Sequence, residues 1–117
     1  MHNFRELDVW KKAIDLTTQF YKFSKLYPKD EIFGLTSQSR RCVVSIPSNI
    51  AEGAGRNTDK QFVQFLSIAL ASSFEFETQL IVAKNLEYIT LESYNILFNE
   101  LRHIQNMLIK LINNYNI

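Results

Sequence analysis

Apolar residues recur at steps of three and four along almost the whole chain, and this spacing constrains the fold more than any other feature. Between Asp8 and Tyr27 the stripe is made of Val9, Ala13, Leu16, Phe20, Phe23 and Tyr27. Such steps place side chains on one face of an α-helix, whereas strands alternate with a period of two. No segment shows that alternation, so the sequence predicts an all-α protein.

Helix-breaking and capping residues divide the pattern into four helices. They are expected at about residues 8–27, 31–54, 58–87 and 91–114. Pro28 ends the first helix, and Asp30 is a suitable N-cap for the second. Thr58 and Gln61 form a T-x-x-Q capping box for the third. Long helices with short connections predict that residues 1–117 form one domain, an up-down-up-down antiparallel four-helix bundle.

Two of the helices carry more apolar surface than a single bundle buries. On the first helix a second stripe, Trp10, Ile14 and Tyr21, lies about 110° round from the main one. The third helix adds two stripes, made of Val63, Leu70, Phe74 and Ile81 and of Phe65, Ile68, Val82 and Leu86. A helix that is apolar nearly all round is expected to be buried nearly all round. Because a monomer would expose these stripes, we expect a homo-oligomer.

Composition predicts a folded, soluble protein. Hydrophobic residues make up 46% of the chain and charged residues 21%, which suits a packed core. The single cysteine, Cys42, cannot form an internal disulfide and fits a reducing compartment. The N-terminal MHNFRELDVW has no apolar signal core, and no apolar run approaches ~18 residues. We therefore expect a cytoplasmic protein with no membrane partner.

Basic residues are concentrated in the first half of the chain. Residues 1–60 hold ten Lys and Arg against seven Asp and Glu, a net charge of +3, whereas residues 61–117 have a net charge of −2. On a monomer these cations would be an ordinary solvated face. In a ring of identical subunits they would repeat into a band that holds phosphate backbones. The candidate nucleic-acid-binding residues are Lys11, Lys12, Arg40, Arg56 and Lys60.

A polar stripe runs beside the apolar face of the second helix. Together with two residues of the third helix it forms a set that we call the polar seam, namely Gln38, Arg41, Ser45, Asn49, Glu52, Glu75 and Gln79. One interpretation is a general acid–base or ligand cluster. The other is a hydrogen-bonded structural seam in which Arg41 pairs with Glu75 or Glu52. We prefer the second because no nucleophile–base pair is evident.

Pro47 lies inside the second helix and removes the amide that would bond to the Val43 carbonyl. A hydroxyl from Ser45 or Ser48 would satisfy that carbonyl. This predicts a kink in the helix and not a break.

A metal centre is the strongest competing interpretation of the fourth helix. Glu100 and His103 match the E-x-x-H of di-iron bundles. However, the other histidine, His2, lies near the free end, and Glu100 and His103 flank the apolar seam of their helix instead of lying on it. We therefore expect no metal, no cofactor and no catalytic residue.

Four stretches of the chain match a known sequence pattern, namely FRELDVWKKAIDL, GLTSQSRRCVVSIPSNIAEGAGR, FLSIALASSFEFETQL and LEYI. Through them most of the chain resembles the bacterial four-helix bundle proteins encoded within intervening sequences of large-subunit ribosomal RNA genes. The resemblance extends to about Ile89, and the fourth helix matches only in pattern. The resemblance implies a homopentameric, barrel-like assembly. It also implies kinship with the accessory proteins of diversity-generating retroelements, which bind nucleic acid and a reverse transcriptase.

The residues and the resemblance together favour a non-enzymatic, homo-oligomeric bundle that binds structured RNA or DNA through a repeated basic surface. Phosphate contacts of this kind position a partner without reading its bases. The alternative is a protein-interaction scaffold, for example an accessory subunit of a nucleic-acid-processing enzyme, that does not itself bind nucleic acid. The first hypothesis predicts that the isolated protein binds RNA, and the alternative predicts that it does not.

Overall fold

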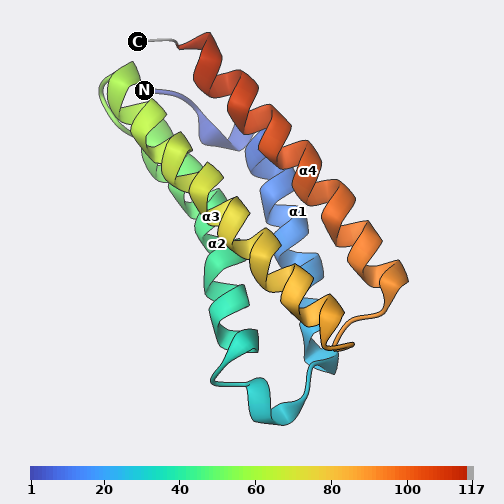
Figure 1. Cartoon of the computed structure of the whole chain (residues 1–117). Coiled ribbons are helices and arrows are strands. Elements are labelled where there is room, and N and C mark those ends of the chain that lie inside the picture. Colours follow the sequence, from blue (N-terminus) through green and yellow to red (C-terminus); the bar gives the residue numbers. More distant parts are fainter. Residues whose placement is uncertain (116–117) are drawn as a thin grey trace.

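The computed structural model of the protein describes residues 1–115, which fold into four long α-helices (Figure 1). The helices are α1 (Asp8–Phe23), α2 (Leu35–Ala54), α3 (Asp59–Asn85) and α4 (Leu91–Asn114). Short 3₁₀ turns at Phe4–Glu6, Ser24–Leu26 and Lys29–Glu31 precede α1 or connect it to α2. The described residues contain no strand, so the all-α prediction is confirmed.

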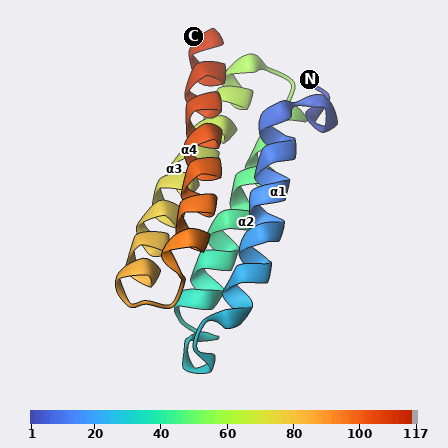
Figure 2. The same ribbon diagram turned by 90° about the vertical axis from the view of Figure 1, so that its right-hand side faces the viewer.

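The helices form an antiparallel bundle in which α1 packs beside α2 and α4, and α3 also packs beside α2 and α4 (Figure 2). The N-terminus, the α2–α3 turn and the end of α4 meet at one end of the bundle (Figure 1). The α1–α2 and α3–α4 connections lie at the opposite end, which we call the base. This arrangement confirms the predicted four-helix bundle.

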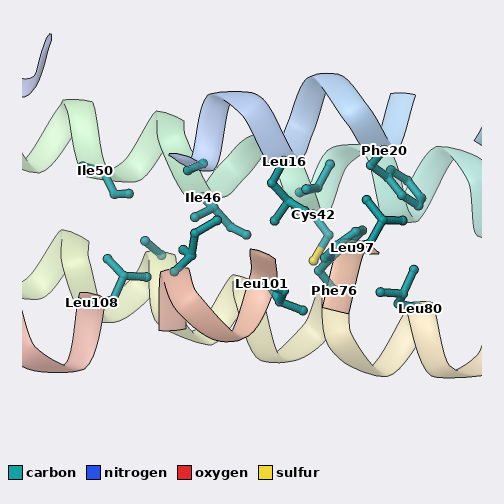
Figure 3. Close-up of a cluster of buried hydrophobic side chains, with 14 of the residues drawn as sticks. Leu16, Phe20, Cys42, Ile46, Ile50, Phe76, Leu80, Leu97, Leu101 and Leu108 are labelled. Carbon is teal, nitrogen blue, oxygen red and sulfur yellow. The ribbon is translucent and has the colours of Figure 1, made fainter. Parts of the chain in front are cut away.

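An apolar core runs along the whole bundle and receives side chains from every helix (Figure 3). At its centre the rings of Phe20 and Phe76 pack edge to face, with centroids 4.8 Å apart. The main stripe predicted on the first helix is buried throughout, apart from the half-buried Phe23. The three- and four-residue spacing of apolar residues thus correctly predicted which side chains of this stripe enter the core.

The N-terminus of α2 differs from the prediction. The helix begins at Leu35, four residues later than expected, and Asp30 does not cap it. Instead, Oε1 of Glu31 accepts a hydrogen bond from the Leu35 amide at 3.1 Å, and Oε2 accepts one from the Tyr88 hydroxyl at 2.9 Å. One carboxylate thus caps α2 and joins the two connections at the base. A local pattern could not reveal this role, because Tyr88 lies 57 residues away from Glu31.

The α2–α3 turn brings the two helices into close contact. Thr58 Oγ1 accepts a hydrogen bond from the Gln61 amide at 3.1 Å, which confirms the predicted cap. A Cβ placed on Gly53 would lie 2.5 Å from the Cβ of Phe65. Gly53 is therefore required for the close approach of α3, and α2 continues past it to Ala54.

Pro47 is tolerated inside α2 because a neighbouring helix satisfies the carbonyl that it frees. The Thr17 hydroxyl of α1 lies 3.2 Å from the Val43 carbonyl oxygen and 2.7 Å from that of Ala13. Its single proton is within reach of both acceptors. α2 consequently runs as an unbroken α-helix on both sides of the proline.

The expected roles of the two serines beside Pro47 are wrong. The Ser45 hydroxyl donates to the Cys42 carbonyl at 2.8 Å, one residue before the carbonyl that needs a donor. Ser48 is exposed to solvent. Ser45 and Ser48 therefore do not donate to the Val43 carbonyl, which receives its side-chain hydrogen bond from Thr17 of α1.

Replacing Thr17 by valine should lower the free energy of unfolding by about 1–3 kcal/mol, because the Val43 carbonyl would be left without its donor. Thr18→Val is a matched control, since the Thr18 hydroxyl bonds only within its own helix, to the Ile14 carbonyl on an exposed face. We expect that variant to stay within about 0.5 kcal/mol of the wild type in urea denaturation. Equal losses of stability in the two variants would contradict the role given to Thr17.

The outer stripe residues of α3 remain partly uncovered in a single chain. Ile68, Phe74, Val82 and Leu86 are 48%, 47%, 42% and 52% exposed. In one chain the bundle covers only one face of this helix, so burial nearly all round would need a second chain. On α1, Ile14 and Tyr21 are likewise exposed.

By length and composition alone, α3 could cross a membrane. An 18-residue window of α3 has a mean hydropathy of 1.3, with 28% of the window buried. The expectation from the sequence concerned continuous apolar runs, and α3 contains none of that length, since polar residues such as Ser67 and Ser73 interrupt it. A helix that packs its inner face on a bundle and its outer face on a second chain has the same composition.

Candidate nucleic-acid interface and polar seam

The five candidate cations are spread along the bundle and do not form one cluster. Arg40 lies near the base, where the end of α1 meets α2. Arg56 and Lys60 lie at the opposite end, around the α2–α3 turn, and Lys11 and Lys12 lie in the first half of α1. A single subunit therefore does not present them to one ligand.

Arg40 is held in place by the end of α1. Its Nε donates to Ser24 Oγ at 2.9 Å, and its Nη2 donates to the Tyr21 carbonyl at 3.3 Å. The guanidinium also lies over the Tyr21 ring, 5.0 Å from its centroid. These contacts orient the group and use only part of its donor capacity.

The other four cations differ in their surroundings. Arg56 Nη2 lies 3.2 Å from Glu52 Oε1, and its guanidinium stacks over the Phe65 ring at 4.7 Å. Exposed pairs of this kind contribute little, so the arginine stays available to phosphate. Lys11 and Lys60 are exposed. Lys12 is half-buried and lines a groove together with acidic side chains, which offset its charge.

The polar seam lies along the outer edge of the α2–α3 contact and is not the buried network that we expected. Its exposed members are Gln38, Arg41, Glu52 and Glu75, and its half-buried members are Ser45, Asn49 and Gln79. The ion pairs among the described residues include no Arg41 pair, and Glu52 binds Arg56 instead. The hydrogen bonds of Ser45 and Asn49 stay within α2, for example from Asn49 Nδ2 to the Ser45 carbonyl at 2.8 Å.

Cys42, beside the seam, is a poor candidate nucleophile. Burial, together with the charge of the nearby Glu75, raises the pKa of its thiol to about 12. The Cys42 thiol also lies 3.3 Å from the Ser72 carbonyl, to which it donates. Because the thiolate is the nucleophilic form, this cysteine is poorly suited to attack a substrate.

Candidate metal ligands are not gathered in one place. Among residues 1–115, no group of three or more His, Cys, Asp or Glu side chains could hold a metal ion. Glu100 lines the groove that also contains Lys12, and His103 is exposed on α4.

His2 is not at a free end, in contrast to the expectation from the sequence. Its amide donates to the Ala54 carbonyl at 2.7 Å, and its ring stacks on Phe62 with centroids 4.4 Å apart. Nε2 lies 3.3 Å from Asp59 Oδ1, and Nδ1 lies 3.4 Å from the Tyr115 hydroxyl. The histidine thereby connects the start of the chain to the α2–α3 turn and to the end of α4.

The family follows from a comparison with known proteins. The model of the 23S rRNA-intervening sequence protein family matches residues 5–110, which include α1, α2, α3 and most of α4. The chain belongs to this family. The family resemblance seen in the sequence motifs is therefore confirmed, and it extends through the fourth helix.

A solved structure agrees with this assignment to the 23S rRNA-intervening sequence proteins. The chain is similar to the crystal structure of a protein with unknown function from the S23 ribosomal protein family of Bacteroides thetaiotaomicron. The two share 28% identity with a TM-score of 0.83, over 90% of this chain and 95% of that chain. A comparison with curated proteins finds no match.

Proposed function

We propose that this 23S rRNA-intervening sequence protein is a non-enzymatic, homo-oligomeric bundle that binds structured RNA through phosphate contacts. The observation that carries the proposal is the placement of the basic half of the chain. α1 and α2 pack side by side and together carry five Lys and Arg against three Asp and Glu, whereas α3 and α4 together carry four against five. A positive excess of this kind attracts a polyanion such as RNA.

Self-association would strengthen RNA binding by this weak positive charge. Each added copy repeats the same cations, and a linked array of weak phosphate sites binds more tightly than any single one. Exposed apolar residues on α3 supply a surface for such an assembly. Ile68, Glu75 and Val82 follow one another at seven-residue steps, so the apolar stripe and the polar seam share this face of α3. The proposed assembly, five copies by family resemblance, would give Arg41 and Glu75 partners from neighbouring subunits.

Neutralising the exposed cations should weaken RNA binding in a salt-dependent way. For the triple variant Lys11→Gln, Arg56→Gln and Lys60→Gln, we expect the slope of log affinity against log salt to become shallower by about 0.7–0.9 for each phosphate that is no longer neutralised. The measurement is a titration of a labelled ribosomal RNA stem-loop at several salt concentrations. Lys110→Gln, on the acidic half, should leave the slope unchanged. Absence of binding at low salt would rule out the proposed function.

Exposed apolar residues at the base favour a second candidate, a protein-interaction scaffold. Phe33 is 95% exposed, and Leu26 and Leu91 beside the α1–α2 and α3–α4 connections are also exposed. Rigid, exposed aromatic side chains are typical anchors of protein interfaces. Under this alternative the isolated protein does not bind RNA, and Phe33→Ala abolishes capture of a protein partner.

A further inference from the structure

A pocket of about 240 Å³ lies at the base of the bundle, between the α1–α2 connection and the first turns of α2. Three of its eight lining residues are cationic and none is acidic. Three more carry hydroxyl groups, and the remaining two are apolar. The cations are Lys25, Lys29 and Arg40, and the hydroxyls belong to Ser24, Tyr27 and Thr36. We call it the base pocket.

Two of these hydroxyls are buried without a partner. Thr36 is 4% exposed and Tyr27 is 6% exposed, and neither Thr36 Oγ1 nor the Tyr27 hydroxyl has a hydrogen bond among the described residues. Buried polar groups are paired in the great majority of cases, and each of these hydroxyls is free to bond a group that enters the pocket. Burial raises the pKa of Tyr27 to about 12, so its hydroxyl remains a proton donor well above neutral pH.

The charged side of the pocket is preorganised. Ser24 and the Tyr21 carbonyl orient the Arg40 guanidinium, which retains further N–H donors. Neither Asp30 nor Glu31 lines the pocket, although both follow Lys29 directly in the sequence. Donors and positive charge therefore face a space without carboxylates.

We propose that the base pocket binds a phosphate group. Arg40 pairs with the anion from a fixed position, the hydroxyls of Tyr27 and Thr36 donate to its oxygens, and Lys25 and Lys29 approach from the solvent side. Phosphate accepts several hydrogen bonds at once, and planar guanidinium groups recognise it well. The phosphate belongs either to RNA, in which case the inference rests on the proposed function and deepens it, or to a free nucleotide.

The test uses the full-length protein and three probes: inorganic phosphate, adenosine monophosphate and a 5′-phosphorylated RNA stem-loop, with adenosine as the unphosphorylated control. By isothermal titration calorimetry, Thr36→Val and Tyr27→Phe should each weaken binding of the phosphorylated probes roughly tenfold, because each removes one hydrogen bond to a charged group. Arg40→Gln should weaken it further. Thr78→Val, an exposed hydroxyl on α3, should have no effect.

Ligand-free stability provides an independent readout. Because Thr36→Val and Tyr27→Phe remove hydroxyls that lack a protein partner, their melting temperatures should equal or exceed that of the wild type. A clear loss of stability would show that these hydroxyls already serve the fold, and it would overturn the proposal.

The probes also separate this inference from the proposed function. If RNA binds but the base-pocket variants bind every probe as the wild type does, the pocket proposal is wrong and the proposed function stands. If adenosine monophosphate or inorganic phosphate binds through these residues while RNA does not, the pocket is supported and the RNA function is wrong. Equal binding of adenosine and its monophosphate would overturn the phosphate assignment.

Discussion

Changing Ile68 and Val82 together to glutamate should reduce the protein to single chains of 13.7 kDa. Both residues lie on the uncovered face of α3, 48% and 42% exposed, at positions two heptads apart. In the proposed homo-oligomer this face is buried, and each unpaired carboxylate placed there would cost about 3 kcal/mol or more. Multi-angle light scattering at micromolar concentration measures the mass directly.

Asn106→Glu is the control for this experiment, because Asn106 is exposed on α4 and lies away from the uncovered face of α3. That variant should keep the wild-type mass, and circular dichroism should show full helicity for both variants. A wild-type protein that scatters as a single chain would contradict self-association. If the double variant kept the wild-type mass, the interface between chains would have to lie on another face.

Phe76→Ala should lower the free energy of unfolding by about 3–5 kcal/mol. The Phe76 side chain is fully buried at the centre of the core, and its ring packs edge to face on Phe20 at 4.8 Å and 86° (Figure 3). Alanine would remove this aromatic pair and leave a cavity that four packed helices cannot readily close.

The same substitution at an exposed phenylalanine isolates the effect of burial. Phe33→Ala, at a side chain 95% exposed, should change stability by less than about 0.5 kcal/mol. Both variants should be measured in urea at a low, fixed protein concentration, because self-association would add to the apparent stability. Similar losses of stability in the two variants would mean that Phe76 is not part of a close-packed core.

Part of the candidate nucleic-acid interface could be predicted from the sequence. Lys11 and Lys60 are exposed, as expected of residues that contact phosphate, and their solvent exposure follows from their positions off the apolar stripes. Arg40 was identified by its charge alone, whereas its fixed orientation comes from contacts with Ser24 and Tyr21 at the end of α1. The unpartnered hydroxyl of Thr36 was missed, because no local pattern distinguishes a paired hydroxyl from an unpaired one.

The polar seam illustrates the same limit. Its members on α2 were correctly placed on one stripe, because helical spacing is a local property. Their burial was overestimated, and Glu52 pairs with Arg56 four residues further along the chain, not with Arg41. How deeply a stripe is buried depends on how α2 is rotated about its axis relative to α3. The spacing of residues along one helix gives no information about that rotation.

The sequence alone determined the four helices, their antiparallel order and the core, since each follows from an apolar period and from capping residues that act within a few positions. Only the tertiary structure decided which donors and acceptors from distant parts of the chain form hydrogen bonds across the bundle. Thr17 supports Val43 over 26 residues, and Glu31 meets Tyr88 over 57. The base pocket likewise combines residues of the α1–α2 connection with residues from the first turns of α2. These contacts depend on the register and rotation of packed helices, which are set by the fit of whole faces and not by the pattern along any one of them.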